Sequence, residues 1–375
     1  MINIAVFFGG ESCEHDISII TGLQFISKLN EYLYNIIPIY IDKLGQWRVG
    51  KNLKDLDNYP DNLGKTIKVG IVNNDSTLYK VNSKKKLTKY ADIDVAVLCL
   101  HGINGEDGSI SAILEASKIP YINSSIMPSS VAMDKIIFNY LCKGLGIDKI
   151  DFVDVSIDDY ESDEQQIIDE LIEFGLPFII KPSRLGSSIG ISVCKSVEEI
   201  NIALKQAFEY DDKLVVERYI NVKKEVNIAC FLNKGELVFS KTEEPINHKE
   251  ILDFNQKYVS TTNGMESMKR ICPANISKEL ELKIKSTAGL IYKKLDMFGV
   301  VRFDFIVDDN DNVLLNEANT IPGSMANYLF DEIYNYPKLI DLLVTNALIR
   351  EEKKLARKKT FESNVLKQGF SGFKK

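Results

Sequence analysis

Two uninterrupted apolar runs of strand length, INIAVFF near the N-terminus and VAVLCL at Val95–Leu100, most constrain the fold of this chain. Strands that are covered on both faces of a parallel sheet have this composition. A helical pattern follows each run, over SIITGLQFISKLN and SISAILEASKI, and YNIIPIYID between them has the pattern of another strand. The first 123 residues are therefore predicted to form a doubly wound α/β domain, in which ligands bind at the carboxyl ends of the strands.

A polar, glycine-containing loop follows each apolar run: GGESCEHD and HGINGEDG. Glycines allow backbone to approach a ligand closely, but Glu11, Glu14 and Asp16 would repel a phosphate group. Either the first loop does not bind phosphate, or its glycines serve only a turn. His101 opens the second loop. A lone histidine is more often structural, but a place at the end of a strand favours a functional role.

The rest of the chain is predicted to form further domains. A helix capped by Ser129 or Ser130 should end near Gly144–Gly146. Strands and helices then alternate, and mainly antiparallel strands follow from Glu225. The predicted division is an N-terminal α/β domain, a central lobe, a C-terminal lobe that carries a metal site, and a basic tail, at residues 1–123, 124–212, 213–350 and 351–375.

Composition excludes several classes of protein. The 375 residues are 45% hydrophobic, but no apolar run is long enough to span a membrane. The start lacks the features of a signal peptide, and the six cysteines form no CxxC pair, so a cytoplasmic protein with reduced thiols is expected. The net charge is −7, with an excess of basic residues confined to the C-terminal end. A nucleic-acid partner is disfavoured for the acidic body.

The segment VVRFDFIVDDNDNVLLNEANTIPG is predicted to be a hairpin with a polar face. Side chains two residues apart lie on one face of a strand, so Arg302 and Asp304 share a face, as do Glu317 and Asn319. If the strands pair, two carboxylates and an amide oxygen converge, which suits Mg²⁺. The alternative is an ordinary solvated strand face, which explains NEANTIPG poorly.

The segment PFIIKPSRLGSSIGIS is predicted to be a strand that ends in Lys181 and a loop rich in Gly and Ser. Backbone N–H groups and hydroxyls of such a loop, with a lysine before it, can hold phosphate oxygens. It is not a Walker loop, since GxxxxGK[ST] is absent. An ordinary turn is the alternative. The apolar strand that ends at Glu217 is a weaker candidate for binding adenine through backbone groups.

Taken together, eight segments resemble the D-alanine–D-alanine ligases of the ATP-grasp superfamily. In chain order they are FFGGESCEHDIS, LHGINGEDGSISAILEASKIPYINSS, SSVAMDK, PFIIKPSRLGSSIGIS, VVERYI, NQKYVS, VRFDF and NEANTIPG. The resemblance implies an ATP-grasp fold, in which two α+β lobes hold ATP and an N-terminal α/β domain precedes them. It also implies that the acid of the first loop holds an ammonium group, that of the first D-alanine, which explains why acids occur there.

The resemblance assigns roles residue by residue. The first D-alanine would lie near Glu14 and His101, with Ser187 and Tyr258 in a hydrogen-bonded trio with Glu14, and with Lys257 beside that tyrosine. ATP would be held by Lys135 and Lys181 at its phosphates, by Glu217, Arg218, Tyr219 and Ile220 at adenine, and by Glu225 at the ribose. Magnesium, or manganese, would be held by Asp304, Glu317 and Asn319. Charge on the transferring oxygens would be stabilised by Arg302 and the backbone N–H of Gly323.

Two departures from the family pattern bear on function. One extra residue separates Glu217 from Glu225, and Tyr328 stands where a serine usually binds the second substrate, with Ser324 as a possible substitute. The expected activity is ATP-dependent formation of D-alanyl-D-alanine through an acyl phosphate, for peptidoglycan precursor synthesis. The alternative ligase joins D-alanine, or another small amino acid, to a different amine such as D-serine. A non-catalytic nucleotide-binding regulator is a third hypothesis, and a homodimer is expected from the resemblance alone.

Overall fold

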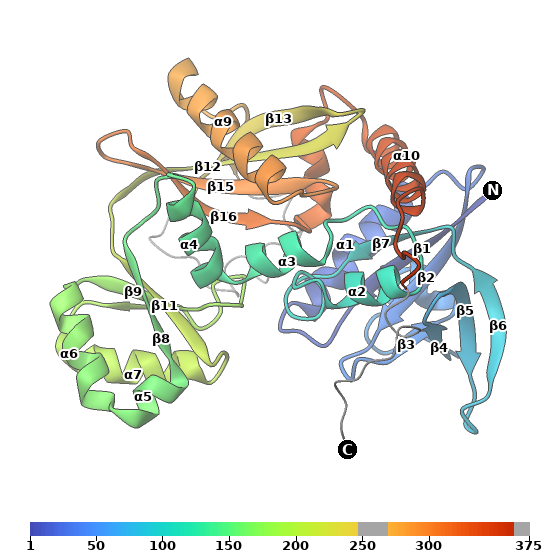
Figure 1. Cartoon of the computed structure of the whole chain (residues 1–375), viewed down its shortest axis with the longest axis horizontal. Helices are drawn as coiled ribbons and strands as arrows, with labels where there is room; N and C mark the ends of the chain where they lie inside the picture. Colours follow the sequence, from blue (N-terminus) through green and yellow to red (C-terminus); the bar gives the residue numbers. More distant parts are fainter. Residues whose placement is uncertain (247–268, 364–375) are drawn as a thin grey trace.

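The computed structural model describes residues 1–246 and 269–363, which form three sheets with helices packed against them (Figure 1). The predicted N-terminal elements are all present. They are β1 (Ile2–Gly9), α1 (His15–Ser27), β2 (Tyr34–Ile41), β7 (Val95–Cys99) and α2 (Ser109–Ala116). Strand β1 lies between β2 and β7 and is parallel to both. The prediction of a parallel α/β core is thus confirmed.

Four of the seven strands of the first sheet were not predicted from the sequence. Its strand order is β6-β5-β4-β3-β2-β1-β7, and the strands from β3 to β6 join it antiparallel. These elements are β3 (Trp47–Val49), η1 (Lys51–Lys54), η2 (Leu56–Asn58), β4 (Ile67–Val72), β5 (Asp75–Val81) and β6 (Leu87–Asp92). Strand β6 is largely exposed, with the sequence LTKYAD, so it lacks the apolar pattern that identifies a buried strand.

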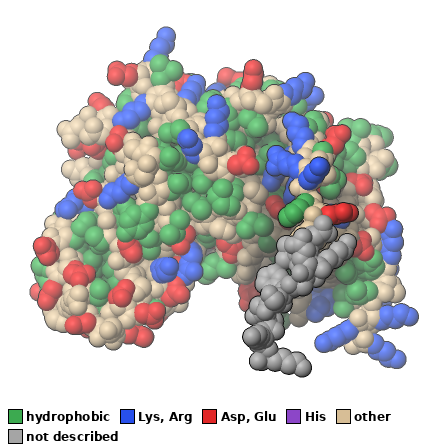
Figure 2. Space-filling model, viewed as in Figure 1, with side chains coloured by type: hydrophobic (Ala, Val, Ile, Leu, Met, Phe, Trp, Pro, Cys, Tyr) green, Lys and Arg blue, Asp and Glu red, His purple; other side chains and the backbone are tan. Residues whose placement is uncertain are grey.

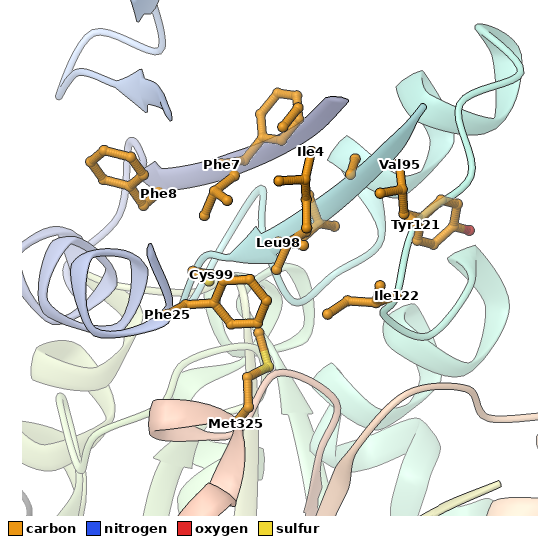
Figure 3. Close-up of a cluster of buried hydrophobic side chains, with 14 of the residues drawn as sticks. Ile4, Phe7, Phe8, Phe25, Val95, Leu98, Cys99, Tyr121, Ile122 and Met325 are labelled. Atoms are coloured by element: carbon orange, nitrogen blue, oxygen red, sulfur yellow. The ribbon is translucent and has the colours of Figure 1, made fainter. Parts of the chain in front are cut away.

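The N-terminal sheet shares its core with the end of the chain. The 3₁₀ helix η4 (Gly323–Leu329) and helix α10 (Tyr336–Leu355) bury apolar side chains in the same cluster as β1, β7 and α1. Figure 3 shows Met325 of η4 beside Phe25 of α1 and Cys99 of β7. The segment after the last strand therefore docks against α1, the helix that follows the first polar loop. The domain boundaries at 124, 213 and 351 stay predictions.

The helix expected between Ser129 and Gly146 is two helices, α3 (Ile126–Met133) and α4 (Lys135–Gly144). The predicted end is confirmed, but the predicted cap is wrong. Asp134 interrupts the helix with an extended ψ of 103°, and its side chain accepts the N–H groups of Ile136 and Ile137. Ser130 instead donates to the carbonyls of Asp107 and Ile126.

The second sheet has the order β10-β9-β11-β8 and is antiparallel throughout. Its elements are β8 (Phe152–Ser156), α5 (Ile157–Ser162), α6 (Glu164–Phe174), β9 (Phe178–Pro182), β10 (Ser192–Cys194), α7 (Val197–Phe208) and β11 (Lys213–Arg218). Side chains of α6 and α7 form one apolar cluster with β9 and β11. This sheet carries Lys181 and Glu217 on adjacent strands.

The third sheet has the order β14-β13-β12-β15-β16. Its elements are β12 (Val222–Asn233), β13 (Glu236–Pro245), β14 (Arg270–Ile271), α9 (Lys278–Lys294), β15 (Val301–Asp308) and β16 (Val313–Asn319). The predicted hairpin is present as β15 and β16. Phe303 and Phe305 are buried in the cluster that α9 covers, and Arg302 and Asp304 alternate with them on the opposite face. The polar face of the hairpin is therefore directed away from this apolar core.

Gly22 allows helix α1 to lie close to strand β1. A Cβ atom at this position would be 2.4 Å from the Cβ of Phe8. We expect Gly22→Ala to lower the free energy of unfolding by about 1–3 kcal/mol, because the overlap exceeds the gain of about 1 kcal/mol in helix propensity. Gly144→Ala is the matched control, since a Cβ there meets nothing within 4 Å. Urea denaturation of both variants measures the difference, and equal stabilities would contradict the prediction.

Candidate active site

The first polar loop and the loop after β7 are joined by hydrogen bonds. Ser12 donates to the carbonyl of His101 (2.7 Å) and accepts the backbone N–H of Glu14 (2.9 Å). Ser18 accepts the backbone N–H of His101 (2.9 Å). His15 binds the Gly10 carbonyl and the Tyr40 hydroxyl, so it shapes the glycine turn. These bonds hold Glu14, directly before α1, next to His101 at the ends of two neighbouring strands.

The Glu14 carboxylate is buried and reaches the Gly/Ser loop of the second sheet. The Ser187 hydroxyl donates to Glu14 Oε1, across 173 residues of sequence. A Cβ at Gly102 or Gly186 would lie 3.1 or 3.0 Å from Glu14 Oε2, so the carboxylate is enclosed by two glycines. The structure thus brings together two members of the predicted trio. Tyr258 and Lys257 lie outside the described residues.

His101 is a buried, neutral imidazole. Its Nε2 lies 2.9 Å from the Thr21 hydroxyl. Burial lowers the pKa of His101 to about 4, with a contribution from the positive charge of Arg302, while a hydrogen bond with the Ile321 backbone acts in the opposite direction. His101 therefore lies between the first loop and the polar face of the third sheet, and it carries no charge at neutral pH.

The pKa of His101 predicts how stability depends on pH. Between about pH 6.5 and 4 the unfolded chain binds a proton that the folded chain does not, so the free energy of unfolding falls as the pH falls. The free energy of unfolding falls by about 3 kcal/mol when the pH crosses this whole range. Urea denaturation at pH 7 and 4.5 should show a smaller loss for His101→Gln than for the unaltered protein. Equal losses would contradict the prediction, since all other titrating groups are common to both proteins.

Glu106 is a site residue that the sequence did not single out. It accepts the backbone N–H of Gly102 at 2.8 Å. Burial, then the negative charges of Glu14 and Glu317, raise the pKa of Glu106 to about 8, against the effects of that hydrogen bond and of Arg302. The sequence signal that could have identified Glu106 was its position among the acids of HGINGEDG. Two neighbouring acids, Glu14 and Glu106, favour a cationic ligand such as an ammonium group.

One candidate phosphate lysine contacts the residue before the Gly/Ser loop, and the other lies on β9, the strand that leads into it. Lys135 Nζ donates to the carbonyl of Leu185 (2.6 Å), which precedes that loop. Lys181 forms an ion pair of 2.5 Å with Glu217 on the neighbouring strand. Ser187 and Ser188 have positive φ angles of 55° and 59°. The loop therefore has an unusual backbone conformation at the point where it meets Glu14.

Glu217 is a buried carboxylate at the end of β11. Burial raises its pKa, but the charges of Lys181 and Lys149 and the hydrogen bonds from Lys181 and Asn139 outweigh burial, so the pKa is lowered. Lys149 is a second residue that sequence reasoning missed. Its Nζ donates to the Asn316 carbonyl of β16 (2.6 Å), and burial lowers its pKa to about 8. Lys149 thus links the second sheet to the strand that carries Glu317.

The residues from Glu217 to Ile220, which the resemblance assigns to adenine, lie at and directly after the end of β11. The N–H groups of Arg218 and Tyr219 are already bonded to Asp151 and Pro177, and the Arg218 guanidinium stacks on Phe174. The base contact expected at Ile220 stays a prediction. The extra residue before Glu225 is absorbed by an irregularity between Val222 and Lys224, where β12 pairs with β15.

The predicted cation site comes together in the hairpin. Asp304 lies opposite Glu317, and Arg302 opposite Asn319. Arg302 binds Asp304 through two hydrogen bonds of 2.7 Å, and the Asn319 amide nitrogen donates to Asp304 (3.0 Å). Burial raises the pKa of Asp304, as does the charge of Glu317, while Arg302 lowers it, and the net pKa is raised.

A divalent cation fits this set of side chains. Asp304 and Glu317 are partly buried carboxylates that lie side by side and repel each other, and a cation between them removes that repulsion. The amide nitrogen of Asn319 is directed to Asp304, which leaves its oxygen as a potential ligand. The described residues contain no cluster of three or more His, Cys, Asp or Glu side chains with ligand geometry. The remaining ligands would therefore be water and substrate phosphates, as Mg²⁺ prefers.

The 3₁₀ helix η4 follows the cation site. It begins at Gly323 and contains three successive left-handed residues, from Ser324 to Ala326. Ser324 donates to Gln24 of α1 (2.5 Å), so its hydroxyl is directed to the N-terminal domain. Tyr328 donates to Glu243 of β13 (2.9 Å). The sequence departure at Tyr328 thus lies beside the polar face of the third sheet.

Two family models cover most of the chain. The D-ala D-ala ligase N-terminus matches residues 3–124, and the D-ala D-ala ligase C-terminus matches residues 141–345. The chain belongs to the D-alanine–D-alanine ligase family. The predicted family is therefore confirmed. Members of this family are ATP-dependent ligases that generally need a metal ion.

Individual relatives agree with the family models. The chain is 36% identical to the D-alanine–D-alanine ligase of Thermosipho africanus, over 97% of this chain and 98% of that one. Among solved structures, it is similar to the D-alanine–D-alanine ligase of Coxiella burnetii, with 26% identity, a TM-score of 0.79, and 94% and 96% of the two chains covered. It is also similar to the VanG D-Ala:D-Ser ligase of Enterococcus faecalis, with 28% identity, a TM-score of 0.77, and 92% and 99% covered. The predicted ATP-grasp fold is confirmed.

Two further observations concern the surface. Within residues 1–246 and 269–363, no helix is both long and apolar enough to cross a bilayer. On the face seen in Figure 2, acidic and basic side chains of the described residues are interspersed. Small-molecule substrates are consistent with membership of a ligase family.

Proposed function

We propose that this protein is a D-alanine–D-alanine ligase that uses ATP and Mg²⁺, with Mn²⁺ as a substitute, and supplies peptidoglycan precursor synthesis. The main support for this proposal is the hydrogen bond from Ser187 to Glu14. It joins an acidic loop suited to an ammonium with a Gly/Ser loop suited to phosphate. An amino acid bound there by its ammonium would present its carboxylate near the phosphates of ATP. A cytoplasmic location, expected from the sequence composition, and a homodimer, expected from the resemblance alone, stay predictions.

The first step transfers the γ-phosphoryl group of ATP to the carboxylate of the first D-alanine. Glu14 would hold the ammonium, with neutral His101 beside it. Lys135 and Lys181 would bind the phosphates, and for this Lys181 must exchange Glu217 for phosphate oxygens. Positioning of this kind supplies much of the catalysis in phosphoryl transfer.

In the second step, the amine of the second amino acid attacks the carbonyl carbon of the acyl phosphate. The carbonyl oxygen gains negative charge, which Arg302 and the Gly323 N–H would stabilise; inorganic phosphate then leaves and takes up the proton that the attacking neutral amine loses as the amide forms. Asp304, Glu317 and Asn319 would hold Mg²⁺, which when bound neutralises charge on the transferring phosphate. Lys257 and Tyr258, which lie outside the described residues, keep the roles that the resemblance assigns to them.

A second candidate function is a ligase that joins D-alanine to another small amino acid, such as D-serine. Tyr328 favours it, because this residue replaces the serine expected at the second-substrate site. The similarity to a D-Ala:D-Ser ligase adds weight to it.

Mass spectrometry of products tests both functions. The protein, ATP and Mg²⁺ would be incubated with D-alanine alone, and then with D-alanine and D-serine, glycine, D-lactate or L-alanine. D-alanyl-D-alanine from D-alanine alone is the expected product. A product formed only from a mixed pair would establish the second candidate. No product and no ADP in any mixture would contradict both.

A further inference from the structure

The connection between α4 and β8, at residues 145–151, contacts two sheets. Lys149 Nζ donates to the Asn316 carbonyl of β16 in the third sheet (2.6 Å). Two residues later, the Asp151 carbonyl accepts the Arg218 N–H at the end of β11 in the second sheet (2.9 Å). Lys149 therefore lies where the strand of the cation site approaches the strand of the candidate adenine segment, and the proposed chemistry does not yet use its charge.

Helix α4 brings Lys149 close to Glu217. This helix lies between the second and third sheets and packs apolar side chains against both (Figure 1). The Lys149 ammonium lies 5.3 Å from the centre of the Phe138 ring, and the amide of the next residue, Asn139, donates to Glu217 Oε1 (3.3 Å). Successive residues of one helix thus contact the lysine and the carboxylate, and the two charges attract each other.

Lys149 also acts on the ion pair between Lys181 and Glu217. Lys181 Nζ lies 2.5 Å from Glu217 Oε2. The positive charge of Lys149 attracts the same carboxylate and repels the Lys181 ammonium. Lys181 therefore experiences a less negative potential than Glu217 alone would create, because the potentials of neighbouring charges add.

The proposed phosphoryl transfer requires Lys181 to leave Glu217 for the phosphates of ATP. Separation of a buried ion pair costs free energy, since each charge loses its partner in a medium of low dielectric constant. Lys149 is held in place by the Asn316 carbonyl and the Phe138 ring. Its charge therefore stays at the junction of the two sheets when Lys181 moves, and it favours this movement by repulsion.

We infer that Lys149 is a positioning residue of the ATP site, whose fixed positive charge lowers the free-energy cost of releasing Lys181 from Glu217. The inference rests on the proposed function, in which Lys181 binds phosphate oxygens. Lys149 acts through Lys181 and does not itself contact the nucleotide. The resemblance assigns no role to this lysine, and its local sequence, GIDKIDF, gives no sign of one.

The alternative is a purely structural role. The bond from Lys149 to Asn316 ties the connection to β16, and the Leu315 N–H donates to the Asp148 carbonyl beside it (3.1 Å). If Lys149 served only as such a tie, its loss would disturb ATP binding whether or not residue 217 carries a charge. If it acts on the ion pair, its effect requires the Glu217 carboxylate.

The affinity for ATP, measured with and without the Glu217 charge, separates these two roles. Isothermal titration calorimetry without any amino acid gives the Kd for the unaltered protein, Lys149→Met, Glu217→Gln and the double variant, and adenosine serves as a ligand that lacks phosphates. Lys143→Met is the matched control, because Lys143 is an exposed lysine at the end of α4 that also lies over a ring, 4.9 Å from the centre of Phe152. Urea denaturation checks that each variant is folded.

We expect Lys149→Met to raise the Kd for ATP about fivefold or more when Glu217 is present, which corresponds to about 1 kcal/mol. In the Glu217→Gln background the same substitution should change this Kd by less than about twofold, and the affinity for adenosine should not change. Lys149→Arg, which keeps the charge, should bind ATP as the unaltered protein does. Lys149→Gln makes the same charge change as Lys149→Met and provides the comparison if the methionine variant does not fold.

Three outcomes would overturn the inference. The first is an equal rise of the ATP Kd in both backgrounds, which would assign Lys149 a structural role or a direct contact with the nucleotide. The second is an unchanged Kd for Lys149→Met, and the third is an absence of ATP binding by the unaltered protein. ATP binding without any ligase product would instead contradict only the proposed function, because the titration contains no amino acid.

Discussion

Asp304→Asn should reduce turnover by about 10²–10³-fold or more, the range found when a group that stabilises transition-state charge is removed. The substitution keeps the shape of the side chain but removes one of the two carboxylate charges at the proposed cation site. The Mg²⁺ concentration needed for half-maximal rate should rise in parallel. Steady-state rates measured across a Mg²⁺ titration, with a parallel series in Mn²⁺, give both quantities.

Three comparisons make this prediction specific to the cation. Asp309→Asn makes the same charge change at an exposed position of the same hairpin and should leave turnover unchanged. Glu317→Gln should resemble Asp304→Asn, and the double variant should be little worse than either, because both residues act through one ion. Full turnover of Asp304→Asn at the usual Mg²⁺ concentration would contradict the assignment. Thermal unfolding of each variant excludes loss of the fold as the cause.

The hairpin shows why part of this site could be predicted from the sequence. The alternation of VRFDF fixes which side chains share a face, and NEAN continues the pattern on the next strand. Only the pairing of the two strands had to be assumed, and β15 pairs with β16 so that Asp304 faces Glu317. Local periodicity and a short turn are sufficient for a contact of this kind.

Glu243 and Lys149 show what the sequence could not provide. Glu243 lies in KTEEP, and its partners Asn227, Arg270 and Tyr328 come from three other elements. Lys149 lies in the loop that joins α4 to β8 and binds a carbonyl of β16. Both are chemically ordinary in their local sequence. Their burial follows from the packing of distant segments, which no local pattern encodes.

The N-terminal domain shows the same limit for the prediction of the fold from local sequence patterns. The buried strands β1 and β7 were predicted because both faces are covered and the apolar runs are continuous. Strand β6 is exposed along most of its length, so it lacks an apolar pattern and was not predicted. The packing of helix α10 against the N-terminal sheet depends on tertiary contacts across more than 200 residues, which the sequence pattern does not encode.

Lys181→Met should lower the free energy of unfolding by about 3–5 kcal/mol and raise the KM for ATP at least tenfold. Lys181 Nζ lies 2.5 Å from Glu217, and both side chains are largely buried. Removal of Lys181 leaves the buried Glu217 charge with only Lys149 and the hydrogen bond from Asn139 to compensate it, which is costly for a buried carboxylate. The large loss of stability therefore comes from the Glu217 carboxylate. The weaker binding of ATP comes from the missing ammonium group of Lys181.

A second substitution separates these two effects. Lys181→Met with Glu217→Gln removes both charges and should recover most of the stability without recovering ATP binding. Lys205→Met is the control for an exposed ion pair, since Lys205 lies 3.6 Å from Glu164 at the surface, and it should change stability by less than about 1 kcal/mol. Urea denaturation and ATP titration of the four proteins measure both quantities. A double variant no more stable than Lys181→Met would contradict the argument from buried charge.

The pH dependence of stability provides an independent measure of the same pair. In the unaltered protein the Glu217 pKa is lowered, so its contribution is present above the pKa of the unfolded chain and is lost as the pH falls through the lower, folded value. Without Lys181, burial dominates and the Glu217 pKa should rise above its unfolded value. The contribution of Glu217 then changes sign, and Lys181→Met should regain stability relative to the unaltered protein as the pH is lowered from 7.5 to 5. A stability difference that stays constant over this range would mean that Glu217 keeps its charge through Lys149 and Asn139 alone.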